Sequence, residues 1–332
     1  MKQIKRSIVF GVLFILLAGG AVTRMAAQEE RAADSVSFGL YIIDIYNLKM
    51  QDNELAIDFY PFFCYRNSNT DPAAFMEIVN AKEFEKSGEY FEEKSSCFYQ
   101  TMKVKSVIKK NWDVAKFPFD KHTVEIVIED IARDVTKVVF IPDATNSTID
   151  KKVKIAGWDI LGSRVEVVTN MWESTYGDPD IAPGDFAKYS RFIFSFDLQR
   201  ADGGWGTFLK TFVGLFIAVM IAFVTLFVRP EDLDPRFGLS VGALFAALAS
   251  QYVISSVLPE TPTQTLVDIL HNVSYVFIFL CVGESAMSLK IYMSETVVNA
   301  KKKALLMDKI AAAIMIPLYF GIVVASVWQA LS

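Results

Sequence analysis

Between residues 36 and 200, apolar and polar residues alternate in short runs separated by turn residues. Typical runs are SFGLYIIDIYNL, NELAIDFYPFFCY, HTVEIVIEDI and SRFIFSFDL. A period of two places apolar side chains on one face of a strand, and closely spaced strands without amphipathic helices between them are typical of a β-sandwich. We therefore predict an all-β, immunoglobulin-like sandwich over residues 28–202.

The pattern changes abruptly at RADGGWGTFLK, after which long apolar runs dominate the chain. Four of these runs are long enough to cross a hydrocarbon core of about 30 Å as helices. Their limits are about 206–228, 237–258, 265–289 and 304–331. The sequence therefore predicts a four-helix transmembrane domain over residues 203–332.

The first 27 residues have the features of a cleaved secretory signal peptide: a basic start, an apolar core and small residues before the cleavage position. A cleaved signal and four spans put the sandwich and the carboxyl terminus on the periplasmic or extracellular side. The connections expected inside carry Lys and Arg, whereas the PETPTQ connection carries neither, in agreement with the positive-inside rule. We expect a multi-pass protein of the inner (plasma) membrane.

The composition agrees with a membrane protein. Of the 332 residues, 52% are hydrophobic and 13% aromatic, more than in an ordinary soluble domain. The net charge of −5 argues against a nucleic-acid partner, and no P-loop, dinucleotide or metal-ligand motif calls for a cofactor. Cys281 lies in an apolar span, so a bridge between Cys64 and Cys97 is possible.

The second apolar span has an unusual composition for a helix in contact with lipid, because it is rich in Gly, Ala and Ser. Small and polar groups at membrane depth are expected to face protein or water. One stripe at helical spacing would line a water-filled path: Gly238, Gly242, Phe245, Ala249, Tyr252 and Ser256. A competing stripe is Ser240, Leu244, Ala247, Gln251 and Ile254. A ring of Phe245 side chains would block ions by dewetting when narrow, and a helix buried in a monomeric bundle is the alternative.

Seven segments follow one another in a recognisable order: FGLYIIDIYNL, AIDFYPFFCY, EIVNAKEF, WDVAKFPFDKHTVEIVIED, IAGWDILGS, FSFDLQR and VLPETPTQT. Through them the chain resembles the pentameric ligand-gated ion channels, the Cys-loop receptor superfamily, over nearly its whole mature length. The two cysteines that close the signature loop in animal receptors are replaced by Lys110 and Val124, as in bacterial members. The resemblance implies a homopentamer or heteropentamer around the second helix, opened by a ligand of the sandwich.

The resemblance also implies how the two domains communicate. Three apolar residues of the signature loop would press on the connection between the second and third spans, at Pro259 and Pro262. These residues are Phe117, Pro118 and Phe119. Asp120 would pair with Arg200 just before the first span, and an ion pair beside an apolar contact is a bistable junction that a ligand can bias.

The chain departs from the family at two places. Where an acid commonly joins the ion pair, at the tip of the first hairpin, alignment places Lys49 and Met50, with Asp52 close by. The segment that normally carries the first ligand-binding aromatic is replaced by DPAAFMEIVNA. The third partner of the ion pair and the first aromatic of the agonist site are therefore left open.

Candidate agonist-binding residues come from two other segments. Trp172, Tyr176 and Tyr189 offer rings that would form a cation-binding cage or merely pack a long loop. A glutamate-rich segment at residues 83–93, with Glu89 at its centre, would sense protons, bind a divalent cation or form a solvated strand face. The agonist class, a small molecule, a proton or a divalent cation, is left open.

The mouth of the second span bears on ion selectivity. Asp234 lies where cation-selective relatives place an acid, whereas Arg236 and Gly238 match a run of anion-selective receptors. Rings of fixed charge decide the sign of the permeant ion because several copies act in one narrow mouth. We favour cations on the strength of Asp234.

Two alternatives to a channel come from the same residues. GLSVG matches the nucleophile-elbow pattern, so Ser240 and His271 would serve an intramembrane hydrolase, but the elbow needs a strand-to-helix turn that a membrane helix lacks. We therefore expect no enzyme. A non-conducting receptor or adhesion module of the same fold is the second alternative, because fold alone does not establish conduction.

Overall fold

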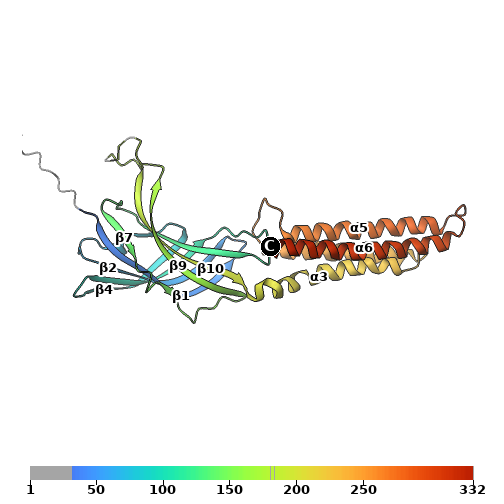
Figure 1. Ribbon diagram of the computed structural model, residues 1–332, viewed down its shortest axis with the longest axis horizontal. Helices are drawn as coiled ribbons and strands as arrows, with labels where there is room; N and C mark the ends of the chain where they lie inside the picture. The colour runs from blue at the N-terminus through green and yellow to red at the C-terminus, as the bar shows by residue number, and fades with distance from the viewer. Residues whose placement is uncertain (1–31, 180, 183, 332) are drawn as a thin grey trace, which may run out of the picture.

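The computed structural model describes residues 32–179, 181–182 and 184–331, and the predicted signal peptide lies outside them. Two β-sheets form one end of an elongated molecule and a bundle of long helices forms the other (Figure 1). The last strand continues through the short helix η1 (Ala201–Gly204) into the bundle. We call the end of the bundle beside the sheets the near end and the opposite end the far end.

The first sheet is mixed, with strand order β4-β5-β2-β1-β7 and with β8 also paired to β1. Strand β1 pairs antiparallel with β2 and parallel with β7 and β8. The strands are β1 (Asp34–Lys49), β2 (Glu54–Tyr65), β4 (Ala81–Glu93), β5 (Phe98–Lys109), β7 (Val138–Pro142) and β8 (Thr148–Ile149). The β-branched and aromatic residues of these runs suit a pleated, half-buried surface, which explains the long β1–β2 ladder.

The second sheet is antiparallel, with strand order β3-β6-β10-β9. Its strands are β3 (Met76–Ile78), β6 (Lys121–Asp130), β9 (Trp158–Trp172) and β10 (Ala187–Arg200). A one-turn helix, α2 (Pro72–Phe75), precedes β3. Alternate residues of β10 are fully buried phenylalanines, so the period-two pattern corresponds to one face turned inward.

The two sheets pack on each other through aromatic side chains. Phe38 of β1 lies 4.2 Å from Phe192 of β10, measured between ring centroids, and 4.6 Å from Phe63 of β2. Rings of this size contribute much of the apolar area that a small core can bury. The amino-terminal domain is therefore a two-sheet, sandwich-like domain.

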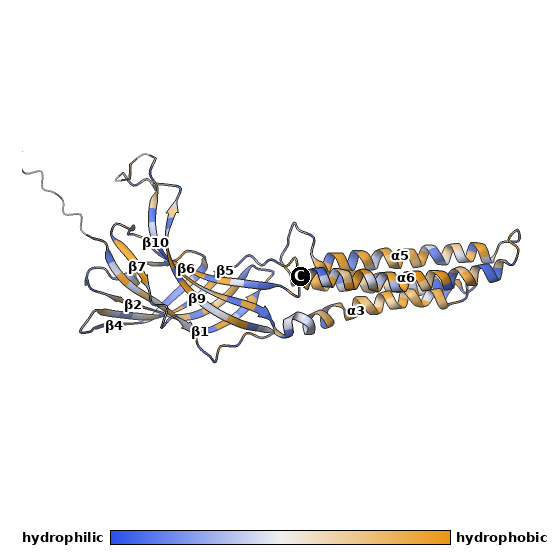
Figure 2. Ribbon diagram, in the orientation of Figure 1, coloured by the Kyte–Doolittle hydropathy of each residue, from blue (hydrophilic) through white to orange (hydrophobic). Residues whose placement is uncertain are grey.

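Four helices form the bundle, and each is long and apolar enough to cross a membrane. They are α3 (Trp205–Val224), continued by η2 (Thr225–Phe227), α4 (Leu233–Ser255), α5 (Leu266–Tyr292) and α6 (Ala300–Leu331). Apolar residues predominate along the helices, whereas the strands are mixed (Figure 2). The carboxyl terminus returns to the near end (Figure 1). The chain is thus a multi-pass membrane protein with a sandwich-like domain at one end of its bundle.

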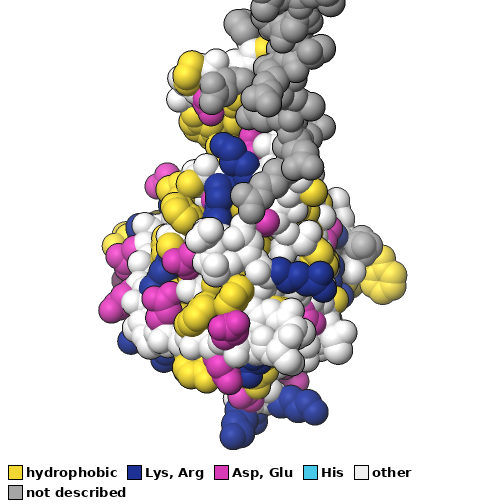
Figure 3. Space-filling view, turned by 90° about the vertical axis from the view of Figure 1, so that its left-hand side faces the viewer, with side chains coloured by type: hydrophobic (Ala, Val, Ile, Leu, Met, Phe, Trp, Pro, Cys, Tyr) yellow, Lys and Arg dark blue, Asp and Glu magenta, His cyan; other side chains and the backbone are white. Residues whose placement is uncertain are grey.

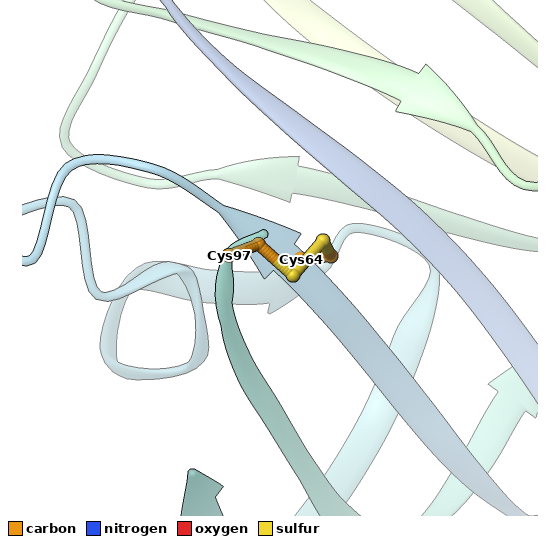
Figure 4. Close-up of a disulfide and its surroundings, with 2 residues drawn as sticks. All are labelled: Cys64 and Cys97. Atoms are coloured by element: carbon orange, nitrogen blue, oxygen red, sulfur yellow. A yellow bond between two sulfur atoms is a disulfide. The ribbon is translucent and has the colours of Figure 1, made fainter. Parts of the chain in front are cut away.

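A disulfide joins Cys64, near the end of β2, to Cys97, in the turn between β4 and β5 (Figure 4). The bridge that the sequence left possible is therefore formed. Cys281 is buried in α5 and is a free thiol. The disulfide ties the β4–β5 hairpin to the middle of the first sheet.

The face of the sandwich farthest from the helices carries acidic and basic side chains interspersed (Figure 3). A surface that binds nucleic acid through the phosphate backbone concentrates Lys and Arg instead. This face therefore offers no large field of one sign.

Candidate functional site

The signature loop, residues 114–120, lies between the sandwich and the near end of the bundle. Two backbone hydrogen bonds fold it tightly: Phe117 N donates to the Val114 carbonyl at 3.0 Å, and Phe119 N donates to the Lys116 carbonyl at 2.8 Å. The peptide bond between Phe117 and Pro118 is cis. Local turns and packing thus shape a loop that carries no cysteine.

Arg200, the last residue of β10, lies at the centre of the junction. Its Nε is 3.2 Å from Oδ1 of Asp120. Its guanidinium carbon lies 4.3 Å from the Trp158 ring centroid and 4.6 Å from the Phe117 ring centroid. A cation between two ring faces is attracted by both quadrupoles, so Trp158, which was not among the predicted site residues, helps to hold Arg200.

Asp120 is almost fully buried and has a second partner, since its Oδ2 lies 2.5 Å from Nε2 of His122. Burial alone would raise the pKa of this carboxyl, but the hydrogen bond with His122 and the charge of Arg200 outweigh burial and lower the pKa. Asp120 is therefore an anion at neutral pH. His122, on β6, follows Asp120 by two residues. In an extended chain residues at this spacing point to the same side, so the sequence could have revealed His122 as a partner of Asp120.

The third contact of Arg200 is a thioether rather than an acid. Nη2 of Arg200 lies 3.1 Å from Sδ of Met50, at the tip of the β1–β2 hairpin. Asp52 instead pairs with Lys49, at 3.7 Å. The third partner of the ion pair, which the sequence left open, is therefore Met50, whose thioether is polarisable but uncharged.

The signature loop contacts two helices. The Phe119 ring lies 5.0 Å from Trp205 and 5.5 Å from Phe208 of α3, measured between centroids. The Ala115 carbonyl accepts a 2.9 Å hydrogen bond from Leu266 N, the first residue of α5. A helix amino terminus leaves such N–H groups without partners inside the helix, so the loop caps α5 directly.

One of the two prolines predicted to receive the loop shares a cavity with the first residue of the loop. Pro259 lines a cavity of about 370 Å³ together with Val114, and Pro262 is exposed. Phe117 lines a neighbouring cavity with Leu258, while Pro118 lies against Gly204. Phe119 thus packs on α3, whereas Val114 and Phe117 line cavities at the connection between α4 and α5.

The predicted pore-lining residues lie together on one face of α4 that the rest of the chain leaves exposed. Phe245 is 66% exposed and Tyr252 is 78% exposed. The remaining members are exposed as well: Asp234, Gly238, Gly242, Ala249 and Ser256. Small and polar groups at membrane depth are expected to face protein or water rather than lipid.

The competing stripe of α4 faces the neighbouring helices of the same subunit. Ser240, Ala247 and Ile254 are buried, and Gln251 accepts a 2.7 Å hydrogen bond from the Tyr275 hydroxyl of α5. Only Leu244 of this stripe is exposed. The two stripes therefore have different surroundings: the one with Phe245 is exposed, and the other mostly packs against the chain's own helices.

The two charged residues at the far end of α4 point in different directions. Asp234 is exposed, whereas Arg236 is fully buried and its Nη2 lies 2.6 Å from Oδ2 of Asp308 on α6. An arginine held inside its own subunit presents its charge less to a surface than an exposed aspartate does. This arrangement favours Asp234 as the residue whose charge faces outward.

The three aromatic candidates for the agonist site lie in one cavity of about 500 Å³. Trp172, Tyr176 and Tyr189 line it together with Glu77, Val79, Glu129, Asp130 and Ile131. The Trp172 and Tyr176 rings are edge to face, with centroids 6.3 Å apart. Burial and then the negative charge of Asp134 raise the pKa of Tyr189, so its hydroxyl is a neutral donor. Aromatic and acidic side chains therefore line the cavity together.

Two of the three acids in this cavity are neutralised. Glu129 Oε1 accepts a 2.6 Å hydrogen bond from Arg191, and Asp130 Oδ2 accepts one of 2.9 Å from Nε of Arg133. Glu77 has no side-chain partner among the described residues. The cavity therefore keeps one uncompensated negative charge. These acids were not among the predicted site residues, although VIED at the end of a strand-like run hints at Glu129.

Glu89 does not line this cavity. It lies on β4, the exposed edge strand of the first sheet, and its Oε1 accepts a 2.8 Å hydrogen bond from Gln100 of β5. The other glutamates of the segment are exposed along the same strand. Within the described residues no group of three or more His, Cys, Asp or Glu side chains has the geometry of a metal site.

The residues of the hydrolase alternative lie at different depths of the bundle. Ser240 belongs to the far half of α4, and its motif is helical throughout. His271 is in the second turn of α5 at the near end, where Nδ1 lies 2.8 Å from the Val267 carbonyl. At 1.5 Å rise per residue the two lie roughly 15 Å apart along the bundle, so they form no catalytic pair in one subunit.

Comparison with models of known protein families gave no match, and comparison with curated proteins gave none either.

Proposed function

We propose that this chain is the subunit of a homopentameric ligand-gated ion channel whose pore is lined by α4. The observation that carries the proposal is the free face of α4, where small, aromatic and hydroxyl side chains are exposed while the opposite face packs inside the subunit. Small and polar residues at membrane depth face protein or water rather than lipid. Copies of the chain arranged around an axis satisfy this requirement, with an immunoglobulin-like sandwich above each bundle.

Phe245 is the proposed gate. Its ring is 66% exposed and lies near the middle of α4, with glycine and alanine above and below it on the stripe. A ring of five phenyl groups makes a hydrophobic constriction that excludes water when narrow and conducts when the helices tilt. The permeant ion is proposed to be a cation, because Asp234 is exposed whereas Arg236 is buried within its subunit.

The agonist is proposed to be a small organic cation such as a primary amine. The supporting geometry is the aromatic cavity with one unpaired acid, Glu77, since a cation gains both ring contacts and a charge partner there. Binding near β9 and β10 is connected to the membrane helices through Arg200, the end of β10. The signal would pass to the signature loop through Asp120 and then to α3 and α5.

The proposed topology places the sandwich and the carboxyl terminus on the periplasmic side of the inner membrane. The far end then lies inside, where Lys290 and Lys301–Lys303 are found. This distribution follows the positive-inside rule.

The decisive experiment is current recording from the protein in planar bilayers over a range of pH, calcium and amine concentrations. We expect a current evoked by amine. In asymmetric salt we expect its reversal potential to shift toward the equilibrium potential of the cation. Phe245→Ala should leak without agonist, while Phe279→Ala, at an equally exposed ring on α5, should not. If the protein passes no current under any of these conditions and Phe245→Ala does not leak, a non-conducting receptor is the better account.

The agonist assignment has its own test. Glu77→Gln removes the unpaired charge and should raise the half-activating amine concentration about tenfold to a hundredfold, corresponding to roughly 1.5–3 kcal/mol for a charged hydrogen bond. The control is Glu125→Gln on β6, which is exposed and does not line the cavity. An unchanged activation curve in Glu77→Gln would place the agonist elsewhere without affecting the evidence for conduction.

A further inference from the structure

A buried charge cluster connects three helices at the far end of the bundle. Arg236 of α4 is fully buried, and its Nη2 lies 2.6 Å from Oδ2 of Asp308 on α6. Its Nη1 lies 3.8 Å from Oε2 of Glu284 on α5. Nε and Nη2 also donate to the Val228 carbonyl, at 2.9 and 2.7 Å. We call Arg236, Glu284 and Asp308 the far-end cluster.

The far-end cluster contains more polar atoms than its protein neighbours satisfy. Across the described parts of α4, α5 and α6, seven buried side-chain atoms in and beside it lack a hydrogen-bond partner. They are Arg236 Nη1, Ser240 Oγ, Glu284 Oε1 and Oε2, Ser285 Oγ, Ser288 Oγ and Asp308 Oδ1. Whole domains ordinarily contain only a few such atoms. Arg236, Ser288 and Asp308 are at most 2% exposed, so bulk water does not satisfy them.

The charge of the cluster is also unbalanced. Two carboxyl groups and one guanidinium leave one net negative charge if all three are ionised. Both carboxyls lie against the same guanidinium, Asp308 at 2.6 Å and Glu284 at 3.8 Å, and two carboxylates that share one cation repel each other. An uncompensated charge buried in a protein interior is strongly destabilising.

The other groups packed around the cluster do not supply the missing positive charge. On α5 the nearest titratable neighbour is the Cys281 thiol, one turn before Glu284. η2 contributes only Thr225, Leu226 and Phe227, and Val228 contributes its carbonyl. The lysines at the start of α6 are exposed. Neutrality therefore has to come from a bound cation.

We propose that the far-end cluster is a proton-binding site in which Glu284 and Asp308 share one proton. A proton on either carboxyl turns an acceptor into an O–H donor and makes the cluster neutral with Arg236. Sharing of one proton by two close carboxyls is the expected response to their repulsion, and the titration then belongs to the pair. The buried serine hydroxyls can hydrogen-bond water that accompanies the proton.

The position of the site gives the proton a structural effect. Arg236 ties the carbonyl of Val228, which ends the segment after α3, to the first turn of α4. Asp234 lies two residues before Arg236 on the exposed side. Loss of the proton would put a second full negative charge beside Arg236 and change how it divides its hydrogen bonds. The site therefore lets pH act on the start of α4 from inside the subunit.

The test is infrared difference spectroscopy of the purified full-length protein in lipid vesicles at neutral pH. A protonated carboxyl has a carbonyl stretch that a carboxylate lacks. We expect this band in the unmodified protein, and we expect its loss in Glu284→Gln and in Asp308→Asn. Either substitution leaves a single carboxylate opposite a single guanidinium, which is neutral without a proton.

Glu260→Gln, at an exposed acid of the α4–α5 connection, is the control and should keep the band. The unmodified protein tests the proposal even if one variant does not fold, and Glu284→Gln and Asp308→Asn are independent of each other. Absence of the band from the unmodified protein would overturn the proposal. Survival of the band in either folded variant would overturn it as well, because the proton would then belong to another group.

Discussion

Two arginines lie at opposite ends of the helical bundle, and each is paired with an aspartate. Arg200 at the near end has a side chain 11% exposed and lies 3.2 Å from one carboxylate, Asp120. Arg236 at the far end is fully buried and faces two carboxyls, Asp308 at 2.6 Å and Glu284 at 3.8 Å. Arg200 therefore belongs to a balanced ion pair, whereas Arg236 faces one more carboxyl than it can neutralise.

The two arginines also differ in how completely their surroundings are satisfied. At the near end Asp120 has His122 as a second partner, and Arg200 lies between two aromatic rings. At the far end each charged group of the cluster has atoms without partners among the described residues. A fully satisfied buried polar network makes its surroundings rigid, whereas buried polar atoms without partners cost free energy. The near end is therefore a well-satisfied junction between the two domains, and the far end is the one at which a bound proton or water would relieve that cost.

The largest expected effect comes from making the same change at both arginines. Arg236→Met leaves two buried carboxyls without a cation and should lower the free energy of unfolding by about 3–5 kcal/mol. Arg200→Met leaves one carboxylate that still has His122, so we expect a smaller loss, roughly 1–3 kcal/mol. The two variants are compared by measuring their thermal unfolding midpoints after purification in detergent.

Arg229→Gln is the matched control, since its side chain is 78% exposed and 3.9 Å from Glu231. An exposed ion pair of this kind contributes little, so the midpoint should hardly move. Equal losses for Arg236→Met and Arg200→Met would remove the distinction between the two ends.

The near end was largely predictable from sequence because its residues belong to short ordered motifs. FPFD supplies Asp120, and FSFDLQR places Arg200 just before the first apolar span. The two-sheet domain and the four apolar helices are likewise confirmed, because periods and long apolar runs are local properties of a sequence. Trp158 was missed as a partner of Arg200, since ring stacking depends on how β9 and β10 align.

The far end could not be predicted in the same way. Arg236 and Asp308 are 72 residues apart, and only the rotation of α4 and α6 about their axes brings them together. Hydrophobic periodicity locates these helices but does not fix that rotation for spans that are apolar on most sides. Glu77 and Glu129 in the aromatic cavity were missed for a related reason, because they come from different strands of the second sheet.

A change in backbone contact tests how tightly the near end is built. Gly204 has φ of 91°, and a Cβ there would lie 2.2 Å from the Pro118 carbonyl oxygen. Gly204→Ala should therefore displace the signature loop from α3. The steric overlap and the positive φ together should lower the free energy of unfolding by about 2–4 kcal/mol. Gly214→Ala in α3 is the control, since nothing lies within 4 Å of its added methyl group.

The readout for Gly204→Ala is the thermal midpoint together with agonist-evoked current. We expect a lower midpoint and weaker activation at saturating amine, because the sandwich would no longer press on α3. Gly214→Ala should match the unmodified protein in both. Normal activation in Gly204→Ala would show that the loop transmits its signal through α5 alone.

The smallest expected effect concerns pH at the near end. The pKa of Asp120 is lowered in the folded protein, so its ion pair contributes stability above the unfolded pKa of about 3.9 and loses it as pH falls through the lower folded value. The difference in unfolding midpoint between the unmodified protein and Asp120→Asn should therefore be constant from pH 7 to about pH 5. Below about pH 4 the difference should shrink, because the unmodified protein gradually loses the ion pair of Asp120, which the variant already lacks.

Asp159→Asn on β9, at an exposed carboxylate, should show no such convergence and serves as the control. A difference between the unmodified protein and Asp120→Asn that already shrinks between pH 7 and pH 5 would mean that another group titrates in the contact. His122 is the group to examine in that case, because its Nε2 lies 2.5 Å from the same carboxylate. The near end would then also respond to pH, as is proposed for the far end, and the two arginines would differ in burial but not in the kind of signal they receive.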